Sequence, residues 1–355
     1  MGPMMTNSGL APSPGAEPRS AQTDTEPLDE RLEDVKALML RLAAGDRFER
    51  LGAIVQEHLF TGGKRLRARV AMESVHALGS DDESAVAWAA ACELLHNATL
   101  VHDDLQDGDA LRRGHFTVWV RHGRAQAVNA GDLLLMLPYL AVEHVPVDDG
   151  RRYQLCRAIA RRAEQTVRGQ SLEMGLLGGG QWDWEDYAEA ARGKTSALMA
   201  LPVHGAALIA GCAPEWAAEL AEPFREIGLL FQIQDDVIDL FGDKGRGDRG
   251  GDLREGRVSA LVAEHIRRRP EDADWLIRVL SKPRDETTDR DVDDIARRLE
   301  TSGTLRSVLE RIVRLRDDTL SCLAIRKEPR IRPVAQHLVD LSLRPLRDLM
   351  RDHDV

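Results

Sequence analysis

Two stretches of the sequence decide the fold, and they read ELLHNATLVHDDLQD at residues 93–107 and FQIQDDVIDLFGD at residues 231–243. Each belongs to a helical pattern, 83–103 and 227–241, that is apolar on nearly every side. Helices of this kind lie in the centre of a bundle, because none of their faces suits water. Both stretches then run into acids with the pattern DDxxD, so the sequence predicts two acidic clusters at the ends of two central helices.

The rest of the chain also reads as helices separated by breakers. Helical patterns cover residues 29–44, 48–60, 64–78, 83–103, 131–142, 151–177, 195–210, 214–241, 257–268, 289–299, 304–325 and 333–351. No segment shows β alternation, and an aromatic content of 4% argues against an all-β fold. Length alone favours two domains, but no linker divides the chain after its N-terminal segment. We therefore expect one all-α domain, a helical bundle, over residues 29–355.

The N-terminal segment 1–28 differs from the rest in composition. It holds five of the fifteen prolines, together with Gly, Ser and Thr, and almost nothing that could be buried. Such a composition predicts a disordered tail, with a docking peptide as the alternative.

Charge and cysteine content exclude several classes of function. The chain carries 48 Lys and Arg against 59 Asp and Glu, a net charge of −11, so nucleic acid is not expected as a partner. It has no run of about 18 apolar residues, which predicts no membrane span, and no signal sequence opens it. The cysteines are scattered, without CxxC pairs, which favours thiols in a reducing cytoplasm over disulfides or zinc. They are Cys92, Cys156, Cys212 and Cys322.

The spacing of the acids points to a metal. Residues four apart on a helix share a face, so Asp103 and Asp107 point together, as do Asp235 and Asp239. Buried like charges need a counter-charge, and Mg²⁺ takes carboxylate oxygens together with substrate phosphates. Two facing clusters would form a Mg²⁺-lined mouth for a diphosphate. The alternative is a solvated acidic helix end, which a single DDxxD would leave open.

Basic residues that could hold a diphosphate occur in three places. The pair Gly62-Gly63 precedes Lys64 and Arg67, where backbone N–H groups and side chains could hold phosphate. The others are Arg112-Arg113 and Lys194-Thr195. For each alone, a solvated basic surface is the alternative interpretation. His96 and Gln232 lie on the same helical stripes as the acids, although a lone His on an apolar helix is as readily a core residue.

In this order the motifs resemble the trans-isoprenyl diphosphate synthase (polyprenyl synthetase) family. They are GGKRLR (62–67), ELLHNATLVHDDLQD (93–107), LRRG (111–114), GKT (193–195), FQIQDDVIDLFGD (231–243) and GDLREG (251–256), and segments within 107–132 look like those of geranylgeranyl-type members. The resemblance covers most of the chain from about residue 50. It implies an isoprenoid-synthase-type bundle around a central cavity, usually in a homodimer. It also implies head-to-tail condensation of isopentenyl diphosphate with an allylic diphosphate.

The resemblance assigns roles residue by residue. It implies Mg²⁺, three ions with substrate bound, on Asp103, Asp107 and Asp235. Further assignments by motif are Asp104, Asp236 and Asp239 in support of the metals; Lys64, Arg67, His96 and Arg113 for isopentenyl diphosphate; Arg112, Lys194, Thr195 and Gln232 for the allylic diphosphate; and Arg257 for substrate binding.

Several positions depart from the family pattern. The proline after GGKRLR is Ala68, and RRGKPT reads RRGHFT with His115 and Phe116. The loop lysine has no clean counterpart in residues 246–252, and the lysine of EGK is Arg257. Arginine keeps the charge but does not replace lysine in geometry. Since both acidic motifs are intact, we expect activity with altered efficiency or substrate choice.

Product length depends in this family on the cavity floor. The positions four and five before the first DDxxD are Thr99 and Ala98, about 6–7.5 Å deeper along the helix. Small side chains there predict an open tunnel and a C20 product, with C25 or longer as the alternative. Met136 is a candidate for the next barrier. Otherwise Ala98 and Thr99 serve only helix packing.

Two other functions compete with the synthase. A terpene cyclase uses one DDxxD with an (N/D)xx(S/T)xxxE motif, which the second helix lacks because Ile238 and Asp239 occupy the Ser/Thr positions. A cyclase also needs no isopentenyl site. A non-catalytic modulatory subunit would be expected to lose acidic motifs, and this chain keeps both. The synthase is therefore preferred.

Overall fold

The computed structural model describes residues 28–45, 50–179, 182–242 and 249–355. The predicted N-terminal tail lies outside the described residues except for Leu28, which begins the first helix. The elements in chain order are α1 (Leu28–Ala44), α2 (Arg50–Phe60), α3 (Leu66–Ala77), α4 (Asp82–Asp107), β1 (Leu111–Arg112), β2 (His115–Phe116), α5 (Val118–His122), α6 (Arg124–Glu143), α7 (Asp149–Leu176), η1 (Leu177–Gly179), α8 (Trp184–Ala191), η2 (Arg192–Ser196), α9 (Ala197–Ile209), α10 (Pro214–Phe241), α11 (Gly251–Arg254), α12 (Ala260–Arg268), η3 (Pro270–Asp272), α13 (Ala273–Leu280), η4 (Arg284–Glu286), α14 (Asp289–Thr301), α15 (Thr304–Ser321), α16 (Leu323–Lys327), η5 (Pro329–Ile331), α17 (Arg332–Leu343), η6 (Arg344–Leu346) and α18 (Arg347–Asp352).

The prediction of an all-α fold is confirmed, with local differences. The described residues include one two-residue hairpin, β1 and β2, in which Leu111 pairs with Phe116 and Arg112 with His115. The turn between them is tight because Arg113 and Gly114 both adopt positive φ. The patterns missed the short helices α5, α8 and α13. The segment expected as one helix over 304–325 is two, since Cys322 is extended between α15 and α16.

Helix α4 lies in the core and is longer than the predicted 83–103, because it begins at Asp82 and ends at Asp107. The Asp81 carboxylate accepts a hydrogen bond from the Ser84 N–H at 2.7 Å and caps its N-terminus, and Gly108 ends it in the left-handed region. Its Trp88 ring packs against Gly205 of α9, where a Cβ would come within 1.9 Å of the ring. The Trp88 indole N–H also donates to the Pro202 carbonyl at 2.8 Å. Only a glycine at 205 allows this approach of α4 and α9.

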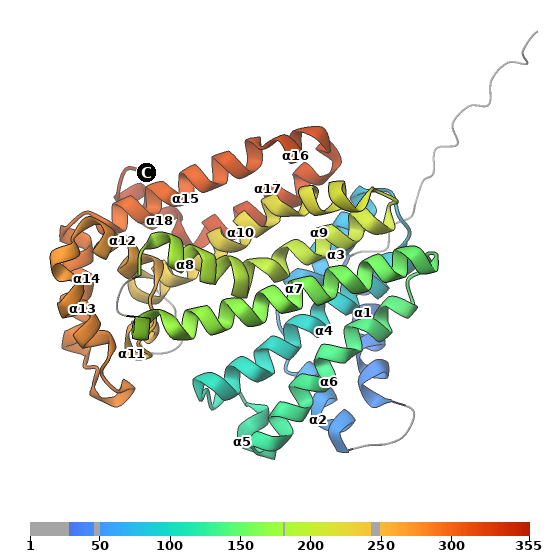
Figure 1. Ribbon diagram of the computed structural model, residues 1–355, viewed down its shortest axis with the longest axis horizontal. Coiled ribbons are helices and arrows are strands. Elements are labelled where there is room, and N and C mark those ends of the chain that lie inside the picture. The colour runs from blue at the N-terminus through green and yellow to red at the C-terminus, as the bar shows by residue number, and fades with distance from the viewer. Residues whose placement is uncertain (1–27, 46–49, 180–181, 243–248) are drawn as a thin grey trace, which may run out of the picture.

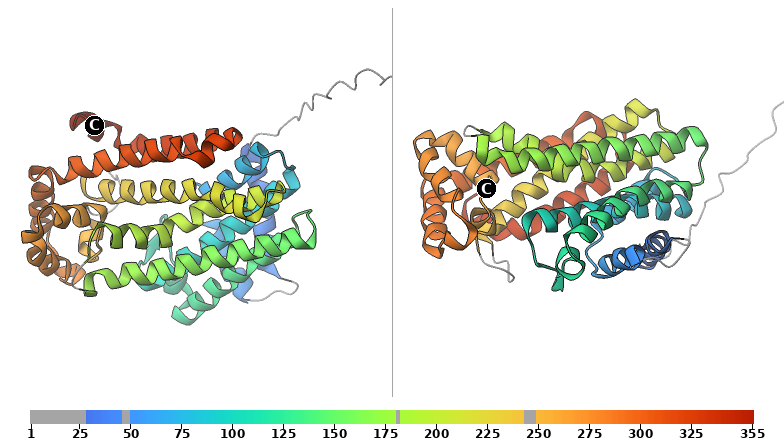
Figure 2. Two further views of the ribbon diagram at one scale, coloured as in Figure 1. Left: turned by 45° about the horizontal axis from the view of Figure 1, so that its top comes forward. Right: turned by 60° about the horizontal axis from the view of Figure 1, so that its bottom comes forward.

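Helices α7, α9 and α10 run side by side along the length of the molecule, with α4 and α6 on one side and α15 and α17 on the other (Figures 1 and 2). Two apolar clusters meet on α10. Its first half, including Phe224 and Ile227, packs with α4 and α9, and its second half, including Ile233 and Val237, packs with α8 and α12 to α15. The single domain predicted for residues 29–355 stays a prediction.

Helix α6 differs from the expectation that no segment could span a membrane. Among the described residues it is the one helix that is long and apolar enough by length and composition. Its inner face, with Leu134, Leu137 and Ala141, is buried, and it packs along α4. A core helix of a water-soluble bundle has the same profile, and 44% of the apolar window is buried here. Its outer face carries exposed Met136 and Leu140.

Candidate active site

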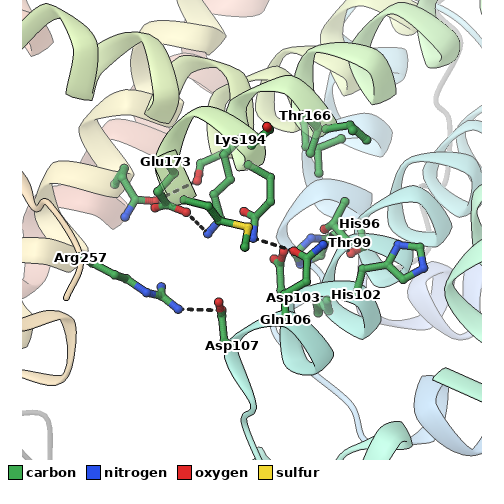
Figure 3. A pocket seen from close by; sticks show the side chains of 18 of the residues that line it. His96, Thr99, His102, Asp103, Gln106, Asp107, Thr166, Glu173, Lys194 and Arg257 are labelled. Carbon is green, nitrogen blue, oxygen red and sulfur yellow. Dashed lines mark hydrogen bonds and ion pairs between the residues drawn. The ribbon is translucent and has the colours of Figure 1, made fainter. Parts of the chain in front are cut away.

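A cavity of about 1090 Å³ lies between α4, α6, α7, α9 and α10. Its mouth is polar and its depth is apolar, because α4 and α7 each contribute small or apolar residues first and acids near their ends, while α10 adds acids and α6 and α9 add leucines. On α4, for example, Leu95 and Thr99 line the depth and Asp103 and Asp107 the mouth. Figure 3 shows the mouth from close by. The volume is at the upper end of the range for small-molecule sites.

The first acidic motif divides between cavity and core. Asp103 and Asp107 both line the cavity, as their spacing predicts, whereas Asp104 is buried on the other side of α4. The Arg112 Nε donates to the Asp104 Oδ1 at 2.6 Å, which ties the hairpin to the end of α4. The Arg257 guanidinium donates to the Asp107 Oδ2 at 2.6 Å across the mouth. Cations therefore contact two of the three acids.

The second motif divides in the same way. Asp235 and Asp239 line the cavity, and Asp236 is buried behind them. The Asp236 carboxylate accepts hydrogen bonds from the Tyr187 hydroxyl at 2.7 Å, the Ala260 N–H at 2.7 Å and the Gln232 amide at 2.9 Å. The bonds from Tyr187 and Ala260 fix the end of α10 against α8 and α12, and the bond from Gln232 lies within α10.

The donor set at the mouth fits a hard divalent cation. Burial raises the pKa of Asp103 to about 6; Lys194 opposes this rise, and the neighbouring Asp107 adds to it. A cation between these carboxylates would offset the repulsion. No three Asp, Glu, His or Cys side chains among the described residues form a complete metal site. Asp103 and Asp107, which share one face of α4 at the mouth, suit Mg²⁺, because this ion takes one or two carboxylates and completes its shell with substrate phosphates and water.

Lys194 and Thr195 lie in a π-helical turn, η2, between α8 and α9. Such turns insert an extra residue into a helix and are frequent at functional sites. Here the turn places both side chains on the cavity wall. The Thr195 hydroxyl donates to the Gln232 Oε1 at 2.8 Å, and Gln232 in turn donates to Asp236. The three predicted residues Lys194, Thr195 and Gln232 therefore meet beside the second motif.

A second cavity of about 920 Å³ lies behind this wall, between α3, α10 and α17. Lys64 and Arg69 line it on one side and apolar residues of α10 and α17 on the other. The two cavities share four lining residues, Arg67, Thr195, Gln232 and Asp235. Two compartments thus meet at the residues that the motifs single out.

Arg67 and His96 form a buried basic corner at this junction. The Arg67 Nε and the His96 Nδ1 are buried and have no hydrogen-bond partner among the residues that the structure describes. Burial, with the charge of Arg67 beside it, holds the pKa of His96 well below its usual value, so the ring is neutral. Buried Glu93 accepts a hydrogen bond from the Ala68 N–H at 3.3 Å. A proline at position 68 could not donate this bond, so Ala68 gives Glu93 a contact that the family pattern lacks.

The remaining predicted cations lie at the edge of the site. Arg113 is exposed and its guanidinium lies on Gly63, where a Cβ would come within 2.4 Å. Arg257 joins Asp107 to Glu255, with its Nε 3.0 Å from the Glu255 Oε2. Residues 246–248 of the loop with the missing lysine lie outside the described residues. Arg249 donates to the Leu240 carbonyl at 2.6 Å and to Asp293 at 2.9 Å, so it points toward α14.

Comparison with known proteins identifies the family. The Polyprenyl synthetase family matches residues 49–299. The chain belongs to the polyprenyl synthetase family. A short chain isoprenyl diphosphate synthase of Methanocaldococcus jannaschii is 35% identical over 229 residues, which are 64% of this chain and 69% of that protein.

Solved structures agree. A geranylgeranyl pyrophosphate synthase superposes with a TM-score of 0.79 at 26% identity, over 90% of this chain and 98% of that one. A polyprenyl synthase from Caulobacter crescentus, complexed with calcium and isoprenyl diphosphate, superposes with a TM-score of 0.76 at 26% identity, over 88% and 94%. The predicted family and isoprenoid-synthase-type fold are therefore confirmed, and the chain is a short-chain trans-prenyl diphosphate synthase that acts on isoprenyl diphosphates.

Within this polyprenyl synthetase, three acids at the mouth escaped the sequence analysis. Glu173 on α7 and Asp252 and Glu255 around α11 all line the cavity. Burial, with Asp236 and Asp239 nearby, raises the pKa of Asp252 well above its usual value. Asp252 lies inside the GDLREG motif at 251–256, where a single acid between Gly and Leu forms no paired pattern. Glu173 follows Gly169-Gln170 on a helix without an acidic cluster, so no local pattern marked it.

The apolar depth of the cavity also corrects two expectations. Thr99 lines the wall, but Ala98 is fully buried in the core and is not a wall residue. Met136 is 56% exposed on the outer face of α6, and its neighbour Leu135 lines the cavity instead. One residue along a helix turns the side chain by about 100°, which the spacing alone could not resolve. The remaining wall comes from Leu95, Leu100, Ala163, Val167 and Leu198.

Proposed function

We propose that this synthase is a Mg²⁺-dependent prenyltransferase that condenses isopentenyl diphosphate with dimethylallyl, geranyl or farnesyl diphosphate and releases all-trans geranylgeranyl diphosphate, C20. The observation that carries the proposal is the pair of cavities that meet at Arg67, Thr195, Gln232 and Asp235. One has an acidic mouth above an apolar depth, which suits a diphosphate with a hydrocarbon tail. The other has a basic edge, which suits the second diphosphate.

The allylic diphosphate binds at the acidic mouth. Asp103, Asp107 and Asp235 would hold Mg²⁺, which as a Lewis acid stabilises the charge of the departing diphosphate. Lys194 and Arg112 add positive charge on the protein side. The apolar wall below excludes water from the cation left on the substrate. The calcium bound with an isoprenyl diphosphate in the Caulobacter crescentus structure supports a divalent metal.

Isopentenyl diphosphate binds at the junction of the cavities. The unpartnered Arg67 Nε and His96 Nδ1 supply buried polar atoms for phosphate oxygens. Lys64 lines the second cavity and Arg113 lies at its approach, beside Gly63. The double bond of isopentenyl diphosphate then attacks the allylic carbon, and the loss of a proton gives a chain five carbons longer.

A C20 product is favoured over a shorter one by two small side chains of the wall, Thr99 on α4 and Ala163 on α7. No aromatic side chain lines the cavity among the described residues, so a C25 or longer product is the second candidate.

A terpene cyclase and a non-catalytic modulatory subunit are less well supported. The basic corner of Arg67 and His96 has no use in a cyclase, which takes one substrate. Both acidic motifs line the cavity, whereas a modulatory subunit needs neither.

Assembly and location belong to the same proposal. Val128, Met136 and Leu140 are exposed apolar side chains on one face of α6. A second copy of the chain could cover them, so we expect a homodimer, as the family resemblance implies. The reduced cysteines and the substrates fit a cytoplasmic enzyme, without nucleic acid as partner and with α6 in a core rather than in a membrane.

One assay tests these points. Purified protein is incubated with Mg²⁺, isopentenyl diphosphate and each of the C5, C10 and C15 allylic diphosphates, and the products are measured by mass. A linear C20 diphosphate is expected. A cyclic hydrocarbon formed without isopentenyl diphosphate would replace the proposal with a cyclase, and the absence of turnover with every primer would favour a modulatory subunit.

A further inference from the structure

Glu173 is the acid in direct contact with Lys194. It lies in the last turns of α7, and its carboxylate accepts a hydrogen bond from the Lys194 Nζ. Both side chains are largely buried, with exposed fractions of 22% and 16%. A charge-assisted bond in such surroundings is stronger than one on the surface. Figure 3 shows the pair at the cavity mouth, with Asp103 on the facing helix.

The backbone explains why these two residues meet. A Cβ on Gly169 would come within 2.1 Å of the Lys194 N atom, and a Cβ on Gly193 within 2.6 Å of the Gly169 Cα. Two glycines thus let α7 touch the π-helical turn directly. Glu173 is four residues after Gly169, so it lies on the same face of α7 one turn nearer the mouth. This contact fixes where Glu173 stands relative to Lys194.

Asp103 is the competing acid for Lys194. It lines the same cavity mouth, and the Lys194 charge acts on it across the cavity. An ammonium paired with Asp103 would occupy a carboxylate that the proposed function assigns to Mg²⁺. A Lys194 held by Glu173 instead leaves Asp103 open and keeps the ammonium beside the position of the diphosphate.

We infer that Glu173 is a positioning residue: it holds Lys194 away from the Asp103 carboxylate and aims the ammonium at the allylic diphosphate. The inference rests on the proposed function, which places the metal on Asp103 and the diphosphate at Lys194. Glu173 itself needs no contact with substrate. Removal of its charge releases Lys194 to pair with Asp103, so Mg²⁺ then has to displace an ammonium.

The test is Glu173→Gln, which keeps the size of the side chain and removes its charge. Binding of inorganic pyrophosphate in the presence of Mg²⁺ is measured by titration calorimetry, and the Mg²⁺ concentration at half-saturation is measured alongside. We expect both to weaken about tenfold, the size of a lost charge-assisted hydrogen bond. The KM for the allylic diphosphate should rise with them, while the KM for isopentenyl diphosphate stays within twofold of the wild type.

Matched variants separate positioning from a merely structural role. Glu164 is an exposed acid on the same helix and pairs with Arg168. Glu164→Gln should therefore leave both titrations unchanged. Glu173→Asp keeps the charge and should restore most of the affinity. In a Lys194→Gln background, Glu173→Gln should add nothing, because it acts through Lys194.

The inference is overturned if Glu173→Gln binds Mg²⁺ and pyrophosphate within twofold of the wild type, or if its effect persists undiminished in the Lys194→Gln background. A melting curve for each variant checks the fold. The titrations need no turnover, so a wild type that binds Mg²⁺ and pyrophosphate but makes no prenyl product would refute the proposed function without touching the role of Glu173.

Discussion

The two acidic motifs share one pattern and one cavity, but the protein supports them by different means. Arg112 holds Asp104 and Arg257 holds Asp107 in the motif on α4. In the motif on α10, uncharged groups, including the Tyr187 hydroxyl and the Ala260 N–H, hold Asp236. The first motif is thus paired with arginine cations. The second is anchored in the core by hydrogen bonds from uncharged groups.

The two helices also differ in how far they line the cavity. From α4 the wall includes Leu95, Thr99 and Leu100 below the acids, whereas α10 contributes only Gln232, Asp235 and Asp239. The apolar depth therefore belongs to α4 and its neighbours α6, α7 and α9. Under the proposed function we therefore expect metal binding to depend on both helices, and product length on α4 with its neighbours rather than on α10.

The largest expected effect tests whether both acidic motifs are needed for turnover. Asp103→Ala and Asp235→Ala should each lower kcat/KM on the order of 10³-fold, because a metal that stabilises the leaving group is worth several kcal/mol and each 1.36 kcal/mol is a factor of ten. Steady-state kinetics with geranyl or farnesyl diphosphate measures this. Glu219→Ala, at an exposed position near the start of α10, serves as a control. If either variant keeps near-normal turnover, its motif does not hold metal.

The next effect tests the assignment of product length to α4. Thr99→Phe places a ring on the cavity wall about 6 Å below Asp103, and the product should shorten from C20 to C15. Mass analysis of the products measures the shift. Ala98→Phe is the matched variant: Ala98 is fully buried in the core, so the ring should destabilise the fold by about 1–3 kcal/mol. A shortened product from Ala98→Phe, with Thr99→Phe unchanged, would reverse the assignment.

A smaller effect concerns the cation compensation of the first motif. The Arg257 guanidinium contacts two acids, with its Nη2 2.6 Å from the Asp107 Oδ2 and its Nε 3.0 Å from the Glu255 Oε2. The single ammonium of a lysine cannot hold both acids in the same geometry. Arg257→Lys should therefore free Asp107 and lower the Mg²⁺ concentration at half-saturation about threefold, the size of a weak exposed pair. Arg284→Lys, which touches only the outer side of Glu255, is the control. An unchanged Mg²⁺ dependence would mean that Arg257 does not compete with the metal.

The positions of the two acidic motifs on central helices could be predicted from the sequence, because helical periodicity is a local property. Helical spacing placed Asp103 and Asp107 on one face, and the apolar segments around them predicted central helices. Spacing also placed Gln232 on the face of the second motif, whereas Lys194 and Thr195 were assigned by the family resemblance. All three residues line the cavity.

The rest depended on contacts between distant segments. Glu173 meets Lys194 because Gly169 and Gly193 allow two backbones to touch, and no pattern within α7 shows that. Ala98 and Thr99 are adjacent in sequence, and only the rotation of α4 against α6 and α9 decides which of them faces the cavity. Asp236 is anchored by Tyr187 and Ala260, which lie 49 and 24 residues away.

The smallest effect tests the neutral anchoring of the second motif through its pH dependence. Burial raises the pKa of Asp236 from 3.8 to about 7, although its three hydrogen bonds oppose this. The folded protein therefore keeps a proton that the unfolded chain releases above about pH 4. Its contribution to stability is full below that pH and is lost as the pH rises toward 7.

The asparagine of Asp236→Asn cannot ionise, so the variant serves as the reference. In metal-free buffer, the difference between the Tm of the wild type and the Tm of the variant should fall by a few °C between pH 5 and pH 8. Asp291→Asn is the control, because the pKa of Asp291 is lowered rather than raised in the folded protein. Lys282 and the Thr288 cap hold the pKa of Asp291 at about 2, so this acid is ionised in both states over that range and its Tm difference should stay level. If the difference for Asp236→Asn also stays level, the carboxylate is ionised at pH 5, and the second motif is charge-compensated like the first.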